Sequence, residues 1–315
     1  MNQNTIEYSL VIPIYKNEDN LPDLFSALSG LSNRLDDSFE VVFVVDGSPD
    51  RSFLIIQSQL ENLPYRAQLI SHSRNFGAFV AVRTGLEHAT GKFTAVMAAD
   101  LQEPIELIEV FFSCLKKDEA DIVFGKRTDR KDPPLRKFLA KTYWKLYRKF
   151  VLAEIPEGGV DVFACNSMVK DTLLSIQEPN SSLIAQLFWV GYRRSFIPYE
   201  RQERKHGKSS WGMRKRLQYM LDSIFSYSDL PILAVLWIGV TGCTITFIIG
   251  LVTLVGKMFG LIEVPGYTSL TLIILFFSSL LLMTQGVIGC YLWRAFENTK
   301  KRPLSITNRL ITNDK

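Results

Sequence analysis

The sequence predicts an α/β protein in which a mostly parallel sheet carries helices on both faces and is followed by two membrane-spanning helices. Short apolar runs typical of buried strands alternate with segments of helical periodicity, and the connections between them are short. Residues 230–256 and 264–293 contain no Asp, Glu, Lys or Arg. Each stretch exceeds the roughly 20 apolar residues that a helix needs to cross a bilayer.

Each expected element follows from a local pattern. Apolar runs bounded by turn residues indicate strands, Gly91 is a common helix stop, and proline is tolerated in a first helical turn. In an open sheet of this kind, ligands bind beyond the carboxyl ends of the strands. The expected strands cover residues 9–14, 39–45, 67–71, 93–98 and 121–124, and the expected helices cover residues 21–35, 52–63, 77–89 and a segment that opens at Pro104.

The distribution of basic residues predicts the orientation in the membrane. The 315 residues carry a formal net charge of +4, and residues 201–216 contain seven Lys or Arg against one acidic residue. Residues 294–302 are also basic, whereas the connector between the apolar stretches contains only two charged residues, Lys257 and Glu263. By the positive-inside rule, we expect a multi-pass protein of the cell (inner) membrane with its catalytic domain and both termini in the cytoplasm. Because the basic clusters adjoin apolar stretches, they favour anionic lipid over nucleic acid.

The predicted organisation has six parts. They are a cytoplasmic α/β domain (1–212), a juxtamembrane amphipathic helix (213–229), a first membrane helix (230–256), a short external connector (257–268), a second membrane helix (269–293) and a cytoplasmic tail (294–315). Residues 134–152 are basic and aromatic with helical periodicity, and two interpretations stay open: a helix at the bilayer interface or an ordinary amphipathic surface helix. The four cysteines show no CxxC spacing, so neither a zinc site nor a disulfide framework is indicated.

Asp100 and Gln102 form a candidate metal site at the end of the fourth expected strand. A carboxylate followed two residues later by a carboxamide can place two oxygen ligands on one Mg²⁺ or Mn²⁺ and leave positions for phosphate oxygens. A single aspartate at a strand end is more often a helix cap, so this interpretation depends on other polar residues at the same edge of the sheet.

Such residues follow each of the first three strands. Pro13, Tyr15 and Glu18 lie at or after the end of the first strand, Asp46 follows the second, and Arg74 follows the third. Tyr15 can contact a base, Asp46 can accept hydrogen bonds from a base or ribose, and Arg74 can meet negative charge. Structural interpretations stay open as well, since Asp followed by Gly is a common turn pair and Glu18 can begin a helix.

These segments, with the sequence PGYTSL before the second apolar stretch and VIGCYL near its end, resemble the family-2 inverting glycosyltransferases of GT-A fold. The resemblance is closest to the polyprenyl-phosphate glycosyltransferase branch with two C-terminal transmembrane helices, which includes dolichol-phosphate mannose synthases. It covers residues 10–303. It implies that Pro13, Tyr15, Glu18 and Asp46 hold the nucleotide.

The resemblance also implies how the diphosphate is held. The family's DxDLQ segment, which binds the metal and the diphosphate, matches Asp100 and Gln102, so Mg²⁺ or Mn²⁺ is the expected cofactor. Ala98 stands where the family usually has its first aspartate, and one carboxylate fewer should weaken cation binding. The segment that contains Lys208 and Trp211 resembles a mobile loop that closes over the diphosphate.

The acceptor site is implied in the same way. Asp161 matches the carboxylate that the family places near the acceptor, as a base or as a positioning group. A phosphate monoester is already largely anionic at pH 7, since its second pKa is about 6, so a phosphate acceptor can attack without losing a proton to Asp161. Arg127 and Arg130 match basic positions in the family's acceptor region, and Arg136 is a further candidate for the acceptor phosphate.

The function that the resemblance implies is the inverting transfer of one sugar from a nucleotide-diphosphate sugar, with uridine as the expected base, to a polyprenyl phosphate such as undecaprenyl phosphate. Two alternatives stay open: a lipid-linked glycan as acceptor, and a catalytically weak scaffold partner, which Ala98 alone favours. A flippase partner is expected to move the product across the bilayer. Small residues in the apolar stretches also leave room for a homo-oligomer.

Overall fold

The structure is a computed structural model, and it describes residues 6–35, 38–128, 145, 148–149, 154–156, 160–178, 181–203, 224–225, 227–228, 230–259 and 267–313. The chain forms two compact units. The first combines Met1–Leu217 with Arg302–Lys315, and the second is Gln218–Lys301. The α/β fold predicted from the sequence is confirmed in the first unit.

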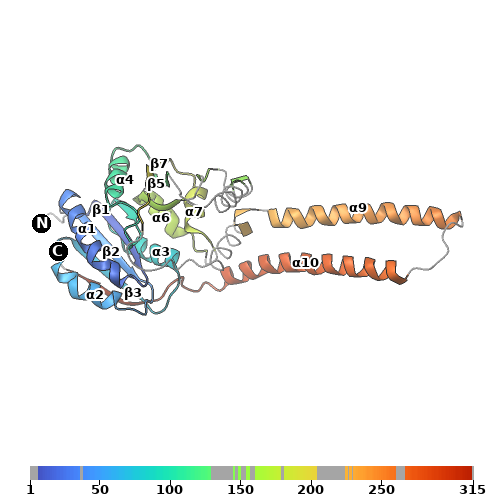
Figure 1. The fold of residues 1–315 in the computed structure, drawn as a ribbon, viewed down its shortest axis with the longest axis horizontal. Helices are drawn as coiled ribbons and strands as arrows, with labels where there is room; N and C mark the ends of the chain where they lie inside the picture. The colour runs from blue at the N-terminus through green and yellow to red at the C-terminus, as the bar shows by residue number, and fades with distance from the viewer. Residues whose placement is uncertain are drawn as a thin grey trace. The chain divides into compact units, whose positions relative to one another are not determined.

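An eight-stranded sheet in the order β7-β5-β6-β4-β1-β2-β3-β8 forms the centre of the first unit (Figure 1). The pairings show that β1 to β5 and β7 all run in one direction, whereas β6 and β8 run in the opposite direction. The expected mostly parallel sheet is therefore present, with two antiparallel additions. The strands are β1 (Tyr8–Ile14), β2 (Phe39–Val45), β3 (Arg66–His72), β4 (Phe93–Val96), β5 (Ile122–Arg127), β6 (Val160–Asn166), β7 (Arg194–Tyr199) and β8 (Thr307–Thr312).

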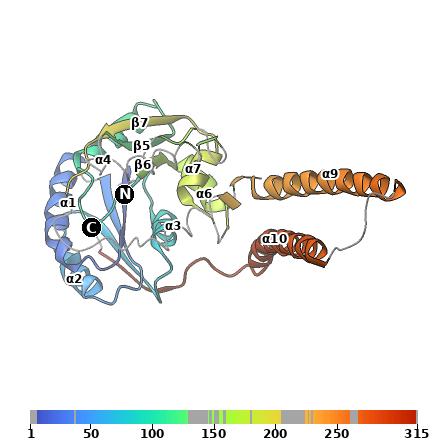
Figure 2. The ribbon, with the colours of Figure 1, turned by 45° about the vertical axis from the view of Figure 1, so that its right-hand side comes forward.

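Helices cover both faces of the sheet (Figure 2). One hydrophobic core lies beneath α1, α2 and α4, and a second lies beneath α3, α6 and α7. Side chains alternate between the cores along each strand: Leu10 and Ile12 belong to the first core and Val11 to the second. The helices are η1 (Glu18–Asn20), α1 (Leu21–Leu35), α2 (Ser52–Gln59), η3 (Leu60–Asn62), α3 (Ala78–His88), α4 (Glu106–Lys116), α6 (Ser167–Ser175) and α7 (Leu183–Trp189).

The predicted elements in the centre of the sheet agree best with the structure. All seven residues of β2 are buried, because both faces are covered, and the sequence predicted its limits and those of α1 correctly. β4 ends at Val96, earlier than predicted, and the helix predicted at 52–63 divides into α2 and η3. The sequence did not predict β6, β7 or β8. Most of β8 is exposed, so no buried apolar run marked it within the predicted tail.

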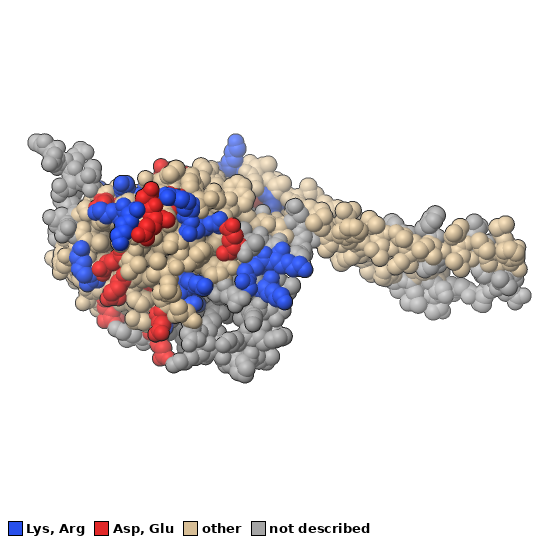
Figure 3. Space-filling model, turned by 90° about the horizontal axis from the view of Figure 1, so that it is seen from above, with Lys and Arg blue, Asp and Glu red and all other residues tan. Residues whose placement is uncertain are grey.

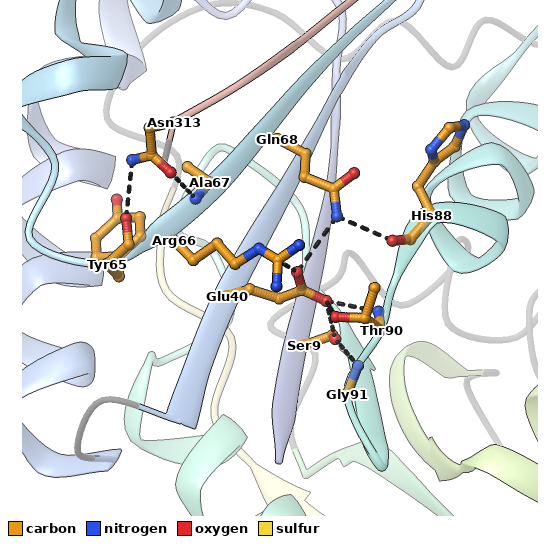
Figure 4. Close-up of polar contacts among 10 residues, drawn as sticks. All are labelled: Ser9, Glu40, Tyr65, Arg66, Ala67, Gln68, His88, Thr90, Gly91 and Asn313. Carbon is orange, nitrogen blue, oxygen red and sulfur yellow. Dashed lines mark hydrogen bonds and ion pairs between the residues drawn. The ribbon is translucent and has the colours of Figure 1, made fainter. Parts of the chain in front are cut away.

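The C-terminal strand is fixed to the sheet by one buried amide (Figure 4). The Oδ1 atom of Asn313 accepts a hydrogen bond of 2.7 Å from the backbone N–H of Ala67. Its Nδ2 atom donates bonds of 3.0 Å to the carbonyls of Leu60 and Tyr65. The side chain of Asn313 thus reinforces the main-chain pairing of β8 with β3, and both of its polar atoms are hydrogen-bonded.

A buried carboxylate joins several strands near the amino ends of the parallel strands (Figure 4). Glu40 of β2 accepts bonds from the hydroxyl of Ser9 at 2.7 Å and from the N–H and hydroxyl of Thr90 at 2.6 and 2.8 Å. The Nε2 atom of Gln68 lies 3.3 Å away. Glu40 therefore connects β1, β2, β3 and the turn before β4.

The second unit contains two long helices, α9 (Leu230–Met258) and α10 (Tyr267–Thr299). Both stretches predicted to cross a membrane are helical. Among the described residues, however, only Phe276–Thr299 is long and apolar enough to span a bilayer. A shorter apolar stretch, Pro231–Gly242, lies within α9. The helices predicted at 134–152 and 213–229 lie almost wholly outside the described residues.

Replacing Glu40 with alanine should lower the free energy of unfolding of the first unit by about 3 kcal/mol or more. The substitution leaves several buried donors without an acceptor, and each unpaired group costs about 1–3 kcal/mol. Urea unfolding followed by circular dichroism measures the effect, with the exposed Glu61→Ala as the control. Glu40→Gln, which keeps one acceptor oxygen, should lie between the two, and equal stability of Glu40→Ala and wild type would contradict this role.

Candidate active site

The direction of the strands brings the candidate residues to one edge of the sheet. Because β1 to β5 and β7 run the same way, the segments that follow them meet at their common carboxyl edge. β6 runs the opposite way, so it begins at this edge. Asp161 is its second residue, and its neighbour Val160 pairs with Lys126 of β5. The backbone of Asp161 therefore lies beside the end of β5, at the edge that also carries Asp100.

The residues predicted to bind a nucleotide near the end of β1 lie on the strand itself and in the turn that follows it. Pro13 pairs with Val44 of β2, and Tyr15 follows the strand directly. Glu18 begins η1, as its alternative interpretation expected, and its Oε2 atom accepts a 2.9 Å bond from the N–H of Arg51. The turn after β1 and the turn after β2 are thus bound to each other.

Asp50, which the sequence analysis did not select, organises these two turns. Its carboxylate accepts hydrogen bonds from the hydroxyls of Ser48 and Ser52 at 2.6 and 2.8 Å and from the N–H of Glu18 at 3.1 Å. Burial opposes ionisation, but these hydrogen bonds outweigh it and lower the pKa of Asp50. The Ser-Pro-Asp run after the DG pair was the available sequence signal, since Ser and Asp side chains commonly bond to nearby backbone groups.

Asp46 is buried, with 2% of its surface exposed, and its carboxylate faces the loop after β3. Oδ1 accepts bonds from His72 Nδ1 at 2.9 Å and from the N–H of Phe76 at 2.8 Å, and Oδ2 accepts a 2.8 Å bond from the N–H of Gly77. A carboxylate can accept about four hydrogen bonds, so three of its positions are filled. Asp46 therefore holds the loop after β3 at the carboxyl edge of the sheet.

The glycine after Asp46 allows the close approach of the two loops. Gly47 has a φ of +56°, and a Cβ atom there would lie 2.3 Å from the carbonyl carbon of Arg74. Arg74 is exposed, and its guanidinium stacks over the ring of Phe76 at 4.2 Å. The arrangement leaves the positive charge of Arg74 at the edge where negative ligand groups would bind.

The segment after β4 carries the predicted metal ligands. Asp100 is 9% exposed, and its Oδ1 accepts a 3.3 Å bond from the N–H of Gln102 across Leu101, whose φ is +52°. The Oε1 atom of Gln102 accepts a 2.6 Å bond from Arg201, which follows β7. The backbone of Gln102 is therefore bonded to Asp100, and an arginine already occupies one lone pair of the amide oxygen of Gln102.

Glu103 is a second carboxyl beside Asp100 that the sequence analysis did not select. It is only 2% exposed, and its Oε2 atom has no hydrogen-bond partner among the described residues. Burial, and then the negative charge of Asp100, raise the pKa of Glu103 against the opposing effect of Arg201 and Arg127. An unpaired buried carboxyl oxygen next to a second carboxylate fits a divalent cation, which would supply the missing positive charge.

The described residues contain no group of three or more His, Cys, Asp or Glu side chains that could hold a metal ion. A cation here would depend on Asp100, Gln102 and Glu103 together with oxygens from a ligand or water.

Three further residues complete the described part of this edge. Arg127, predicted to bind the acceptor phosphate, is the last residue of β5, and Tyr199 is the last residue of β7. Burial, followed by the charge of Glu103, raises the pKa of Tyr199, and Arg127 opposes the shift. Arg201, which follows β7, was not selected from the sequence because β7 itself was not predicted. The predicted residues Arg130, Arg136, Lys208 and Trp211 lie outside the described residues.

Comparison with known proteins identifies the family. Residues 9–176, just over half of the chain, match the model described as Glycosyl transferase family 2. The chain belongs to glycosyl transferase family 2. The resemblance noted in the sequence is thereby confirmed at the level of the family, and the protein is a glycosyltransferase.

Relatives of this family-2 glycosyltransferase extend over nearly its whole length. The uncharacterized glycosyltransferase sll0501 of Synechocystis sp. is 33% identical over 315 residues, which covers 97% of this chain and 96% of that protein. The bactoprenol glucosyl transferase of Shigella phage SfX is 31% identical and covers 95% and 97%. The solved mannosyltransferase PcManGT from Pyrobaculum calidifontis shares the fold, with a TM-score of 0.51 at 17% identity over 70% of this chain and 63% of that one.

Replacing Glu103 with glutamine should stabilise the protein increasingly as the pH rises. A carboxyl with a raised folded pKa contributes stability that is full below its ordinary value of 4.5 and is lost as the pH rises through the folded pKa. Glutamine cannot ionise, so Glu103→Gln should melt above wild type at pH 7.5 and differ less at pH 4.5. The exposed Glu106→Gln is the control, and a melting difference that does not change with pH would contradict the prediction.

Proposed function

We propose that this family-2 glycosyltransferase moves one sugar from a nucleotide-diphosphate sugar to a polyprenyl phosphate, with inversion at the anomeric carbon. The observation that carries the proposal is the alignment over 95% of this chain, apolar helices included, with a protein named bactoprenol glucosyl transferase. The strand-end site supports it, because it places carboxylates, an exposed arginine and ordered backbone turns along one edge of the sheet.

The nucleotide binds at the ends of β1, β2 and β3 in this proposal. Pro13, Tyr15 and Glu18 form one side of the site, and Asp46 and Arg74 form the other. Glu18 accepts a bond from the N–H of Arg51, and Asp46 accepts bonds from the N–H groups of Phe76 and Gly77. These bonds support the assignment, because a pocket whose walls are already fixed loses little freedom when a ligand binds. Arg74 provides positive charge for the donor's phosphates, and we propose uridine as the base.

The diphosphate binds at the end of β4, where Asp100 and Gln102 would hold Mg²⁺ or Mn²⁺ beside Glu103. PcManGT was solved in complex with GDP-Man and Mn²⁺, which supports a divalent cation for this relative of similar fold. A bound cation offsets the negative charge that grows on the leaving diphosphate. Lys208 and Trp211 remain our candidates for a loop that covers this group.

The acceptor phosphate approaches from the β5 and β6 side. One of its oxygens forms a bond to the anomeric carbon while the bond from that carbon to the donor's diphosphate oxygen breaks, and the electron pair leaves with the nucleoside diphosphate. No proton needs to be removed from a phosphate that is already anionic. Asp161 therefore orients the acceptor, and Arg127, Arg130 and Arg136 neutralise its charge.

The helices α9 and α10 anchor the protein in the membrane in this proposal. Large apolar side chains are exposed along both helices, among them Leu236, Trp237 and Leu282, and such surfaces need apolar surroundings. On the face drawn in Figure 3, charged side chains are interspersed over the first unit, whereas residues 230–256 and 267–293 of the long helices include none.

The position of β8 supports two crossings. β8 follows α10 in the chain but pairs with β3, which precedes α9. A chain that leaves this sheet and returns to it must cross a membrane an even number of times. We therefore propose a two-helix hairpin with both termini in the cytoplasm, in accordance with the basic flanks. A flippase partner for the product and association with further copies remain parts of this proposal.

Full-length protein in detergent with undecaprenyl phosphate and labelled nucleotide sugars should form a chloroform-soluble labelled lipid. UDP-glucose, UDP-N-acetylglucosamine and GDP-mannose are suitable donors, and undecaprenol without its phosphate is the control acceptor, which should remain unlabelled. Label found only on lipid-linked glycans would indicate the alternative acceptor. No transfer from any donor would favour the scaffold interpretation.

Asp100→Asn should lower kcat by about 100-fold or more, since groups that stabilise charge developing in a transition state contribute on the order of 10²–10³. Because asparagine has the same size and can still accept the bond from the N–H of Gln102, the melting temperature should change little. Asp171→Asn, at an exposed position of α6, is the matched control. Near-normal kcat in Asp100→Asn at saturating Mn²⁺ would rule out the proposed role.

A further inference from the structure

A chain of side-chain hydrogen bonds connects the segment after α10 with the turn after β2. Ser305 Oγ lies 2.9 Å from Thr84 Oγ1, which lies 3.0 Å from His72 Nε2. The other ring nitrogen, His72 Nδ1, lies 2.9 Å from Asp46 Oδ1. Thr84, His72 and Asp46 are each 2% exposed, so water does not replace these bonds. Ser305, Thr84, His72 and Asp46 are called the relay below.

The chemistry of the four groups gives the relay a direction. An ionised carboxylate only accepts, so His72 Nδ1 carries the proton that it shares with Asp46. In the neutral imidazole, Nε2 is then an acceptor and receives the hydroxyl proton of Thr84. The oxygen of Thr84 is left to accept from Ser305. Removing the Thr84 hydroxyl therefore leaves a buried ring nitrogen of His72 without a hydrogen-bond partner.

Main-chain contacts hold the C-terminal segment against the same histidine. Thr307, the first residue of β8, pairs with His72 at a point where the register shifts between Ser71 and His72. The N–H of Ser73 donates a 3.0 Å bond to the carbonyl of Ile306. The residues on both sides of His72 are thus positioned by the segment that leaves α10.

At its other end, the relay fixes the loop 73–77. Asp46 shares its Oδ1 atom between His72 and the N–H of Phe76, and its Oδ2 atom receives the N–H of Gly77. The ring of His72 also meets the ring of Phe76 edge-on at 5.5 Å between centroids. A rotation of Asp46 would release both amides and move the backbone that carries Arg74.

We propose that Ser305, Thr84 and His72 are positioning residues for this loop, so that the segment following α10 is part of the nucleotide-donor site. The inference rests on the proposed function, since it takes Asp46 and loop 73–77 as a wall of the nucleotide site. None of the three positioning residues touches the reacting atoms. They act through Asp46, and their effect should therefore fall on donor binding.

The test compares substitutions that remove or retain one hydroxyl. In the full-length protein, Thr84→Val should weaken binding of UDP by about three- to tenfold, the effect expected of one lost hydrogen bond, and should speed amide hydrogen exchange in residues 73–77. Thr84→Ser should restore both properties, and Ser305→Ala should give a smaller change in the same direction. Thr312→Val, at an exposed position of β8, is the matched control. Affinity for undecaprenyl phosphate should stay unchanged throughout.

The two measurements separate this inference from the function on which it rests. Unchanged UDP affinity and unchanged exchange in folded Thr84→Val would overturn the relay, as would an equal loss in Thr312→Val or in Thr84→Ser. Faster exchange without a loss of UDP affinity would overturn its role in donor binding. Failure of the wild-type protein to bind UDP would instead contradict the proposed donor, and the exchange measurement would still decide whether the relay positions the loop.

Discussion

Two buried carboxylates, one at each end of β2, hold the edges of the sheet in place. Glu40 at the amino end accepts hydrogen bonds from β1, from β3 and from the turn before β4. Asp46 at the carboxyl end accepts bonds from β3 and from the loop that leads into α3. A buried charge is tolerated only when donors are fixed around it, so each carboxylate determines the position of the loops that serve it. The candidate active site occupies the edge that Asp46 organises.

The parts of the fold that the sequence predicted are those that bury both faces of a strand or one stripe of a helix. β2 and α1 have the predicted limits because their apolar residues recur with the period of their element. β7 and β8 lie at the two edges of the sheet, where each strand pairs with a neighbour on one side only. Many of their side chains are at least partly exposed to solvent. Such strands depend on partners far away in the sequence, and local patterns do not reveal them.

The candidate site divides in the same way. Reasoning from strand ends placed Tyr15, Asp46, Arg74 and Asp100 at one edge, because that argument needs only the direction of the parallel strands. It did not reveal His72. This residue lies at the end of β3, and it contacts Asp46 only because β3 pairs with β2. Side chains such as Asp161 are assigned by the family's motif, and their roles remain predictions. The sequence therefore places the candidate residues at one edge of the sheet, whereas the bonds that orient them depend on tertiary contacts.

The return of the chain to the sheet determines how the proposed membrane role of α9 and α10 can be tested. A protein that ended before Leu230 would lose the proposed anchor, and it would also lose β8, Asn313 and Ser305, which belong to the first unit. An effect of such a truncation on turnover would combine the loss of lipid access with the loss of a sheet edge and of the contact to Thr84. Substitutions within α9 and α10 leave β8 in place. Only these substitutions can assign an effect on activity to the proposed anchor itself.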